Sequence, residues 1–228
     1  MNIAYNIDCM EYLKTVPDKF FELAVCDPPY GIGIDGQKER YDFKNPKSSR
    51  KGHAFRGWDN QIPTEQYFRE LERVSDNQII WGGNYFVKHL KNGYKGWIIW
   101  DKGQHGLTMS DCEIAYSTFN TPTRVYEQNR VILLQEGTIH PTQKPVALYE
   151  WILKNYAKEG DKILDTHLGS GSSRIAAYNL GFDFVGCEID EYYFRKQEER
   201  FARHTAQGNL FLELENSCRS KPKQLKDV

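Results

Sequence analysis

Residues 162–180 read KILDTHLGSGSSRIAAYNL, in which a short apolar run passes through a glycine turn into a helical pattern. The apolar residues that end at Asp165 have the length and composition of a buried strand. Gly169 and Gly171 follow, and glycine lets the backbone approach a ligand closely at the start of a helix. The next apolar run ends at Glu188, an acid that could accept hydrogen bonds from ribose hydroxyl groups. This stretch predicts an α/β fold with a nucleotide-like cofactor at the carboxyl ends of its strands.

The glycine loop narrows the kind of cofactor without identifying one. Its pattern fits NAD, FAD and S-adenosylmethionine alike, and Arg174 stands where a GxGxxG motif would have its third glycine. A broad contact with a pyrophosphate is therefore not expected. Because the loop begins with Asp165, a cofactor that carries positive charge suits it better than one that carries phosphate. A tight strand-to-helix turn without a ligand stays open as an alternative.

Hydrophobic periodicity on both sides of this stretch predicts strands that alternate with helices. Strands are expected at residues 3–7, 22–26, 78–81, 97–100, 112–117, 163–165 and 184–188. Helices are expected at residues 9–15, 64–74, 145–159, 172–180 and 190–205. Such alternation is typical of a mostly parallel sheet with helices on both faces, and ligands of these sheets bind at the carboxyl ends of the strands.

The composition is that of an ordinary globular protein. The chain has 228 residues, 39% of them hydrophobic, and 30 basic residues against 31 acidic ones give a formal net charge of -1. This balance excludes a purely electrostatic nucleic-acid binder but allows a local basic face. The five cysteines are scattered and form no CxxC pair, so no metal is expected and reduced thiols fit best. The sequence shows no signal segment and no apolar run of about 18 residues, so we expect a soluble, cytoplasmic protein that does not enter a membrane.

A second motif, Asp27-Pro28-Pro29-Tyr30, directly follows the apolar run at residues 22–26. Its chemistry suits an aromatic amine such as the exocyclic nitrogen of adenine, whose lone pair is delocalised into the ring. The Asp27 carboxylate and the Pro28 carbonyl can each accept one of the two N–H bonds, which frees the lone pair. The prolines stiffen the loop, and Tyr30 can stack on an extruded base. A rigid proline turn with a surface tyrosine is the alternative, but it does not explain an acid at the end of a strand.

With these motifs the chain resembles the amino-methylating DNA methyltransferases, specifically the adenine-modifying members with a permuted motif order. DPPY is the catalytic motif of that family, and its cofactor loop has the form DPFxGSGTT, which here reads DTHLGSGSS at residues 165–173. The run HPTQKP at residues 140–145 looks like the segment that precedes the family's cofactor strand. Residues 184–190 look like its second cofactor motif, and NIDC at residues 6–9 resembles its GDC-type start.

The resemblance covers most of residues 1–30 and 78–200, and its order, with the catalytic motif first, is that of the β-type arrangement. It implies one Rossmann-like methyltransferase domain over residues 1–228. It implies transfer of a methyl group from S-adenosylmethionine to the N6 amine of adenine in double-stranded DNA, with the base flipped into the DPPY pocket. It also implies a bacterial origin or one in a phage or prophage, and often a homodimer.

The family's functional roles can be carried onto matching positions of this sequence. The catalytic residues are then Asp27, Pro28, Pro29 and Tyr30. The cofactor-binding residues are Asp8, Cys9, Asp27, His140, Thr142, Lys144, Asp165, Leu168, Gly169, Ser170, Gly171, Ser172, Glu188 and Ile189. The resemblance places Asp8 near the cofactor's adenine. His140 and Lys144 are expected to orient its carboxylate, the alternative being a helix start with a surface lysine.

The cofactor loop departs from the family pattern at two places. Thr166-His167 replaces Pro-Phe, and Ser172-Ser173 replaces Thr-Thr. The acid and the two glycines of the loop are retained, so cofactor binding is expected to survive. His167 is interpreted as a packing or capping residue rather than a catalyst, because no partner stands at a known spacing.

Residues 31–63 match the family poorly and form a predicted loop insertion. The part from Lys44 to Arg56 contains five basic residues and no acid. A DNA-binding role for target recognition is assigned to Lys44, Lys47, Arg50, Lys51 and Arg56. A solvated loop is the alternative. Three aromatic residues, Tyr41, Phe55 and Trp58, could fill the gap left by a flipped base or anchor the loop. A second basic segment forms the tail at residues 217–228.

Three other functions compete with adenine methylation. Enzymes that methylate the exocyclic amine of cytosine usually have serine in place of Asp27, so the acid argues against them. Amine methyltransferases that act on RNA or on protein glutamine are a second rival, and those that act on glutamine usually begin the motif with asparagine and lack HPTQKP. An inactive, nucleic-acid-binding partner subunit is disfavoured because Asp27, Asp165 and Glu188 are all retained.

Overall fold

The structure is a computed structural model that describes residues 1–36, 38–39, 41, 52–90, 96–103, 105–106, 110–129, 133 and 137–219, with residues 208–219 described through their backbone alone. Among the described residues, eight strands form one sheet in the order β1-β8-β7-β2-β3-β5-β4-β6. The strands are β1 (Asn2–Asn6), β2 (Phe21–Cys26), β3 (Ser75–Trp81), β4 (Trp97–Asp101), β5 (Cys112–Ser117), β6 (Arg124–Glu127), β7 (Lys162–Asp165) and β8 (Asp183–Glu188). The helices are α1 (Cys9–Thr15), α2 (Glu65–Val74), α4 (Val146–Tyr156), α5 (Ser172–Leu180), α6 (Glu191–Arg219) and the 3-10 helix η2 (Gly83–Tyr85).

The sheet is mostly parallel, as the alternation of strands and helices predicted. β5 runs antiparallel to both of its neighbours, β3 and β4, whereas the other five pairings are parallel. The strands β1, β8, β7 and β2 are neighbours and parallel, so their carboxyl ends meet at one edge of the sheet. The predicted motifs follow these ends and are therefore brought together.

Helices cover both faces of the sheet, and alternation along the strands supplies a core to each. Leu23 and Val25 of β2 pack into the core that contains the apolar residues of α4 and α5. Ala24 and Cys26 point the other way, into the core that contains those of α1 and α2. Two hydrophobic cores on opposite faces hold the central strands, and with them the edge where the motifs lie.

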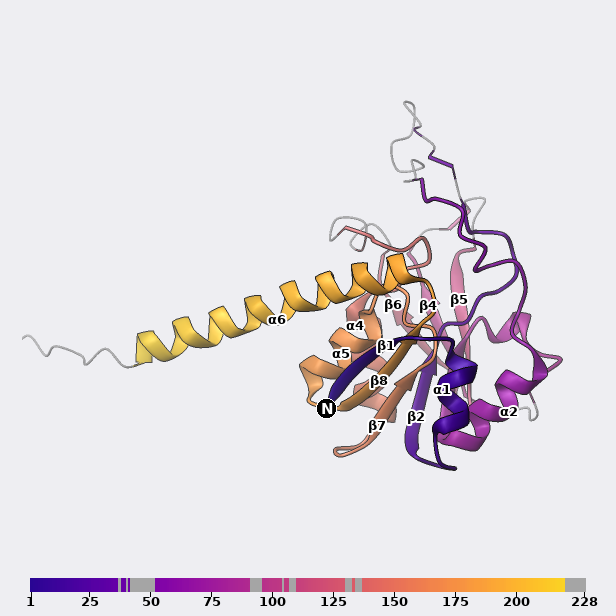
Figure 1. Ribbon diagram of the computed structural model, residues 1–228, viewed down its shortest axis with the longest axis horizontal. Coiled ribbons are helices and arrows are strands. Elements are labelled where there is room, and N and C mark those ends of the chain that lie inside the picture. The colour runs from indigo at the N-terminus through magenta and orange to yellow at the C-terminus, as the bar shows by residue number, and fades with distance from the viewer. Residues whose placement is uncertain are drawn as a thin grey trace, which may run out of the picture.

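Two elements differ from the sequence-based expectation. The four-residue edge strand β6 was not predicted, because three of its four residues are exposed and show no apolar alternation. The last helix was expected to end near residue 205 but runs to Arg219, and it projects away from the sheet (Figure 1). The sequence contains Gly208 there, which lowers helix propensity by only about 1 kcal/mol relative to alanine and does not by itself end a helix.

Candidate active site

A cavity of about 690 Å3 lies at the carboxyl edge of the parallel strands. Its wall brings together all four residues of the DPPY motif with several predicted cofactor residues. The cofactor residues that line it, besides Asp27, are Asp8, Cys9, His140, Thr142, Gly169, Glu188 and Ile189. The predicted cofactor residues that do not line it are Lys144, Asp165, Leu168, Ser170, Gly171 and Ser172. The two motifs thus meet in one cavity, although part of the cofactor loop lies behind its wall.

Asp27 follows β2 directly and has a partner on each carboxylate oxygen. Oδ1 accepts a hydrogen bond from the Tyr30 hydroxyl at 2.6 Å, and Oδ2 lies 2.5 Å from Nζ of Lys144. The Asp27 side chain is 13% exposed, and burial raises the pKa of its carboxyl, although the Lys144 ammonium opposes that rise. A carboxylate has about four lone-pair positions, so two such partners leave room for a further N–H donor. Asp27 is held in one orientation and can still accept.

Tyr30 is fixed by a second aromatic ring and by a glycine. Its ring stacks on Tyr85 with centroids 4.9 Å apart and an interplanar angle of 16°. Gly82 has φ +74°, and a Cβ at this position would overlap the Tyr30 ring. In the sequence Gly82 merely follows the strand expected at residues 78–81, and no motif there indicated its role beside Tyr30.

Asp165 has an internal set of partners. Its carboxylate accepts hydrogen bonds from the backbone N–H of His167 at 3.0 Å and from Ser173 Oγ at 2.5 Å. The residue is 1% exposed, and burial raises the pKa of its carboxyl to about 7 against those two hydrogen bonds. Gly169 and Gly171, both with positive φ, complete the turn that Asp165 holds. Asp165 therefore shapes the loop.

Other residues of this loop also have contacts within the protein, although His167 lines the cavity. Leu168 packs into the core on the α4 and α5 side. Ser170 Oγ and Ser172 Oγ lie 3.1 Å apart, and Arg200 donates to Ser172 Oγ and to the Ser170 carbonyl. His167 packs against the ring of Tyr67 with centroids 5.3 Å apart, and burial lowers its pKa to about 4.

Glu188 ties the end of β8 to the glycine loop. Oε2 accepts a hydrogen bond from the backbone N–H of Gly169 at 2.8 Å, and Oε1 accepts one from that of Asp190 at 2.9 Å. Burial raises the pKa of its carboxyl to about 7. Asp8 faces the same cavity and caps α1 through a 2.7 Å bond from Met10 N–H. Two carboxylates and the loop backbone thus form one end of the cavity.

The HPTQKP segment contributes two buried groups with different surroundings. His140 lies 4.3 Å from the Tyr193 ring and 4.9 Å from the Trp58 ring, between centroids, and burial lowers its pKa to about 3. Its Nδ1 lies 3.0 Å from Thr142 Oγ1. Lys144 is no surface lysine: its side chain is 1% exposed, and its ammonium contacts Asp27. The segment thus reaches both the cavity wall and the catalytic motif.

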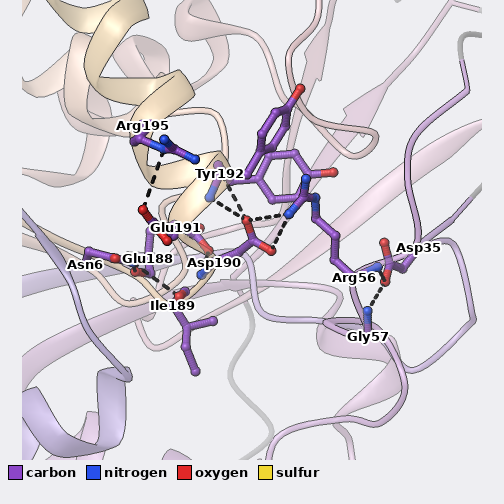
Figure 2. Close-up of polar contacts among 11 residues, drawn as sticks. Asn6, Asp35, Arg56, Gly57, Glu188, Ile189, Asp190, Glu191, Tyr192 and Arg195 are labelled. Carbon is purple, nitrogen blue, oxygen red and sulfur yellow. Dashed lines mark hydrogen bonds and ion pairs between the residues drawn. The ribbon is translucent and has the colours of Figure 1, made fainter.

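The described part of the insertion closes one side of the cavity, a role that the sequence did not predict. Residues 57–63 line the wall, and Asp59 accepts hydrogen bonds from Gly31 and Ile34 N–H, each at 2.8 Å. Figure 2 shows Arg56 reaching the carboxylate of Asp190 at 3.4 Å, with its guanidinium 4.1 Å from the Tyr192 ring centroid. Arg56 therefore fastens the insertion to the start of α6. The other basic residues assigned to DNA, Lys44, Lys47, Arg50 and Lys51, lie outside the described residues.

The described parts of the chain contain no group of three or more His, Cys, Asp and Glu side chains placed to hold a metal ion. They also contain no helix that is long and apolar enough to cross a membrane.

Comparison with known proteins gives the family. A family model described as DNA methylase matches residues 78–199, more than half of the chain. The chain belongs to this family of DNA methylases. It is therefore a DNA methyltransferase, and DNA is its macromolecular partner.

Individual relatives agree with this assignment. The Type II methyltransferase M.HpaI of Haemophilus parainfluenzae is 31% identical over 260 residues, which cover 96% of this chain and 79% of the relative. M.HinfI of Haemophilus influenzae is 24% identical over 253 residues, which cover 88% and 68%. The crystal structure of an M1.HpyAVI–SAM complex superposes with a TM-score of 0.55 at 23% identity, covering 88% of this chain and 100% of that one. The expected methyltransferase fold is thereby confirmed.

Proposed function

We propose that this enzyme transfers a methyl group from S-adenosylmethionine to the N6 amine of adenine in DNA, with the base flipped into the cavity beside Asp27. The observation that carries this proposal is the position of Asp27: it lines the cavity, at the end of β2, with its carboxylate fixed on both oxygens. An exocyclic amine needs an acceptor for its N–H bonds before it can act as a nucleophile. A fixed, charged acceptor at that point is what the reaction requires.

The wall of the cavity fits S-adenosylmethionine by charge and by hydrogen bonding. Asp8, Asp27 and Glu188 all face the cavity, and this excess of carboxylates suits a cofactor with a sulfonium and an ammonium group. Among the described residues, the buried indole N–H of Trp58, in the same wall, has no hydrogen-bond partner. Glu188 would hold the ribose hydroxyls and Asp8 would lie near the adenine of the cofactor. When bound, S-adenosylmethionine supplies an electrophilic methyl group.

The chain's own residues would perform the remaining tasks. Asp27 accepts one N–H bond of the target amine and the Pro28 carbonyl accepts the other, which turns the nitrogen towards a pyramidal geometry. Pro29 keeps the loop stiff. Tyr30 offers a ring face on which the extruded base can stack. No covalent enzyme intermediate is needed, because the site acts through position and charge.

Contact with double-stranded DNA is assigned to the basic segment of the insertion. We propose that Lys44, Lys47, Arg50 and Lys51 neutralise backbone phosphates. Replacing these four residues with glutamine should weaken DNA binding and flatten its salt dependence while cofactor binding stays unchanged. A salt slope equal to that of the wild type would mean that the segment is a solvated loop that does not contact phosphates. The same proposal includes three further points: the enzyme is a homodimer, it is located in the cytoplasm, and residues 1–228 form one domain.

Product analysis tests the proposed function directly. Duplex DNA is incubated with the enzyme and S-adenosylmethionine and hydrolysed to nucleosides, which are identified by mass. The expected product is N6-methyldeoxyadenosine, formed by the wild type and absent with Asp27→Ala. Methyl groups on cytosine would contradict the proposal. Failure of the wild type to bind the cofactor in calorimetry would favour an inactive partner subunit.

A further inference from the structure

Four charged side chains form a continuous row from Asp27 to Lys102, the residue that follows β4. Lys144, just before α4, lies 2.5 Å from Asp27 Oδ2 and 2.9 Å from Glu113 Oε2. The other oxygen of Glu113, Oε1, lies 2.9 Å from Nζ of Lys102, the residue after β4. Two acids and two cations thus alternate, and each neighbouring pair is in contact.

Both lysines of this row are buried, and this restricts the partners that their ammonium groups can have. The Lys144 side chain is 1% exposed and that of Lys102 is 9% exposed, so both ammonium groups are largely shielded from water. A buried charge without a partner is costly, and Lys144 must therefore divide its ammonium between the two carboxylates it touches. Any change in its bond to Glu113 alters its bond to Asp27.

This competition bears on what Asp27 can accept. A carboxylate whose buried ammonium partner contacts no other acid is a weaker acceptor for a neutral N–H donor. Glu113 draws part of the Lys144 ammonium to itself, while Lys102 keeps Glu113 charged and in place. We infer that Glu113 is a positioning residue which, through Lys144, leaves the Asp27 carboxylate free to accept the amine of the target base. This inference rests on the proposed function of Asp27.

The same contacts determine the direction in which the enzyme's activity changes with pH. Burial raises the pKa of Asp27, the Lys144 ammonium lowers it, and the Glu113 carboxylate raises it. Glu113 itself stays charged, because Lys144 and Lys102 overcome its burial and lower its pKa to about 2. The titratable groups that face Asp27 are Lys144, Tyr30, Glu113, Asp165 and Tyr149. Asp27 must be charged to act, so activity is lost as the pH falls through its pKa.

The test is the isosteric variant Glu113→Gln, with Glu127→Gln on the exposed edge strand β6 as its matched control. Methyl transfer to duplex DNA is measured from pH 5 to pH 9, together with S-adenosylmethionine affinity by calorimetry and thermal unfolding. With Asp27 left, among the described residues, as the one carboxylate in contact with Lys144, kcat should fall about tenfold to a hundredfold. KM for DNA and cofactor affinity should stay close to wild type, and the acidic limb of the kcat profile should move to lower pH. The control should match the wild type in every one of these measurements.

A second variant, Lys102→Met, gives the opposite shift and covers the case in which Glu113→Gln folds poorly. Without Lys102, Glu113 takes more of the Lys144 ammonium, and the acidic limb should move to higher pH. Unchanged kcat and pH profile in a folded Glu113→Gln, or shifts in the same direction for both variants, would overturn the inference. If the wild type itself forms no N6-methyladenine, the proposed function fails instead, so the two failures are distinguishable.

Discussion

Asp27 directly follows strand β2, and Asp165 is the last residue of the neighbouring parallel strand β7, yet the structure surrounds them differently. Asp27 lines the cavity, and its partners are two side chains, the Tyr30 hydroxyl and the Lys144 ammonium. Asp165 does not line the cavity, and its partners, a backbone N–H and Ser173, belong to its own loop. The comparison separates an acid that can receive a substrate from one that holds a turn, although both lie at the carboxyl ends of neighbouring strands.

The difference follows from what comes after each acid in the sequence. Two prolines follow Asp27, and neither has an N–H to donate, so Pro29 cannot cap the carboxylate as the N–H two residues on does at Asp165. Thr166 and His167 follow Asp165, and the N–H of His167 turns back onto the carboxylate. The residues after the acid therefore decide whether its oxygens are used locally or remain available.

Removing the Asp27 carboxylate should have the largest effect on the catalytic side of this comparison. Asp27→Ala should lower kcat by more than about a thousandfold, because an electrostatic contact made in the transition state is lost. Cofactor and DNA binding should remain, as calorimetry and gel shift can show. A kcat within about tenfold of the wild type would mean that Asp27 and Asp165 differ less than their surroundings indicate.

Crowding Tyr30 should come next in size. In Gly82→Ala the new methyl group overlaps the Tyr30 ring, and φ +74° is a strained conformation for alanine. Displacement of the ring by about 1 Å should cost about a hundredfold in kcat. Gly181→Ala is the matched control: it has φ +76° and open space around its Cβ, so it should lose stability but keep its kcat.

On the cofactor side, Glu188→Ala should weaken S-adenosylmethionine binding about tenfold to a hundredfold, as expected for hydrogen bonds to a charged group. The variant also frees the backbone N–H of Gly169 and Asp190. Isothermal calorimetry measures the change, and kcat at saturating cofactor should change less than the affinity. An unchanged dissociation constant would mean that the ribose contact is misplaced.

The smallest effect is expected for Tyr30→Phe, which keeps the ring and loses the hydroxyl bonded to Asp27 Oδ1. The enzyme should stay active with a loss of about twofold to tenfold in kcat, the range of a single hydrogen bond. Tyr30→Ala should instead raise KM for DNA, because it loses a stacking face worth about 1–3 kcal/mol. Equal effects of the two substitutions on KM would contradict a stacking role for the Tyr30 ring.

The convergence of motifs could be predicted from the sequence because parallel strands place their carboxyl ends at one edge. Asp27 and Glu188 meet in one cavity for this reason, though 161 positions separate them in the printed sequence. The partners of Lys144 could not be predicted in this way. Glu113 reaches it from the antiparallel strand β5, and neither periodicity nor motif spacing indicates which side chains from such a strand meet a buried lysine.

The insertion is a second region whose contacts could not be predicted from the sequence. Few apolar residues repeat in it, so the sequence indicated only a basic loop for DNA. In the structure its last part is held by polar contacts, from Arg56 to Asp190 and from Gly31 to Asp59, and it closes the cavity. Such contacts join residues far apart in the chain and leave no local pattern.

The most direct test of the account compares Asp27→Asn with Asp165→Asn in single-turnover methyl transfer, with cofactor and duplex DNA at saturating concentrations. Asparagine keeps the shape of each side chain and removes its charge. Asp27→Asn should lose about a hundredfold to a thousandfold in rate while it still binds the cofactor. Asp165→Asn should stay within about tenfold of the wild-type rate and show its effect in cofactor affinity and thermal stability instead. Equal rate losses for the two variants, or a full rate for Asp27→Asn, would contradict the division of roles between the two acids.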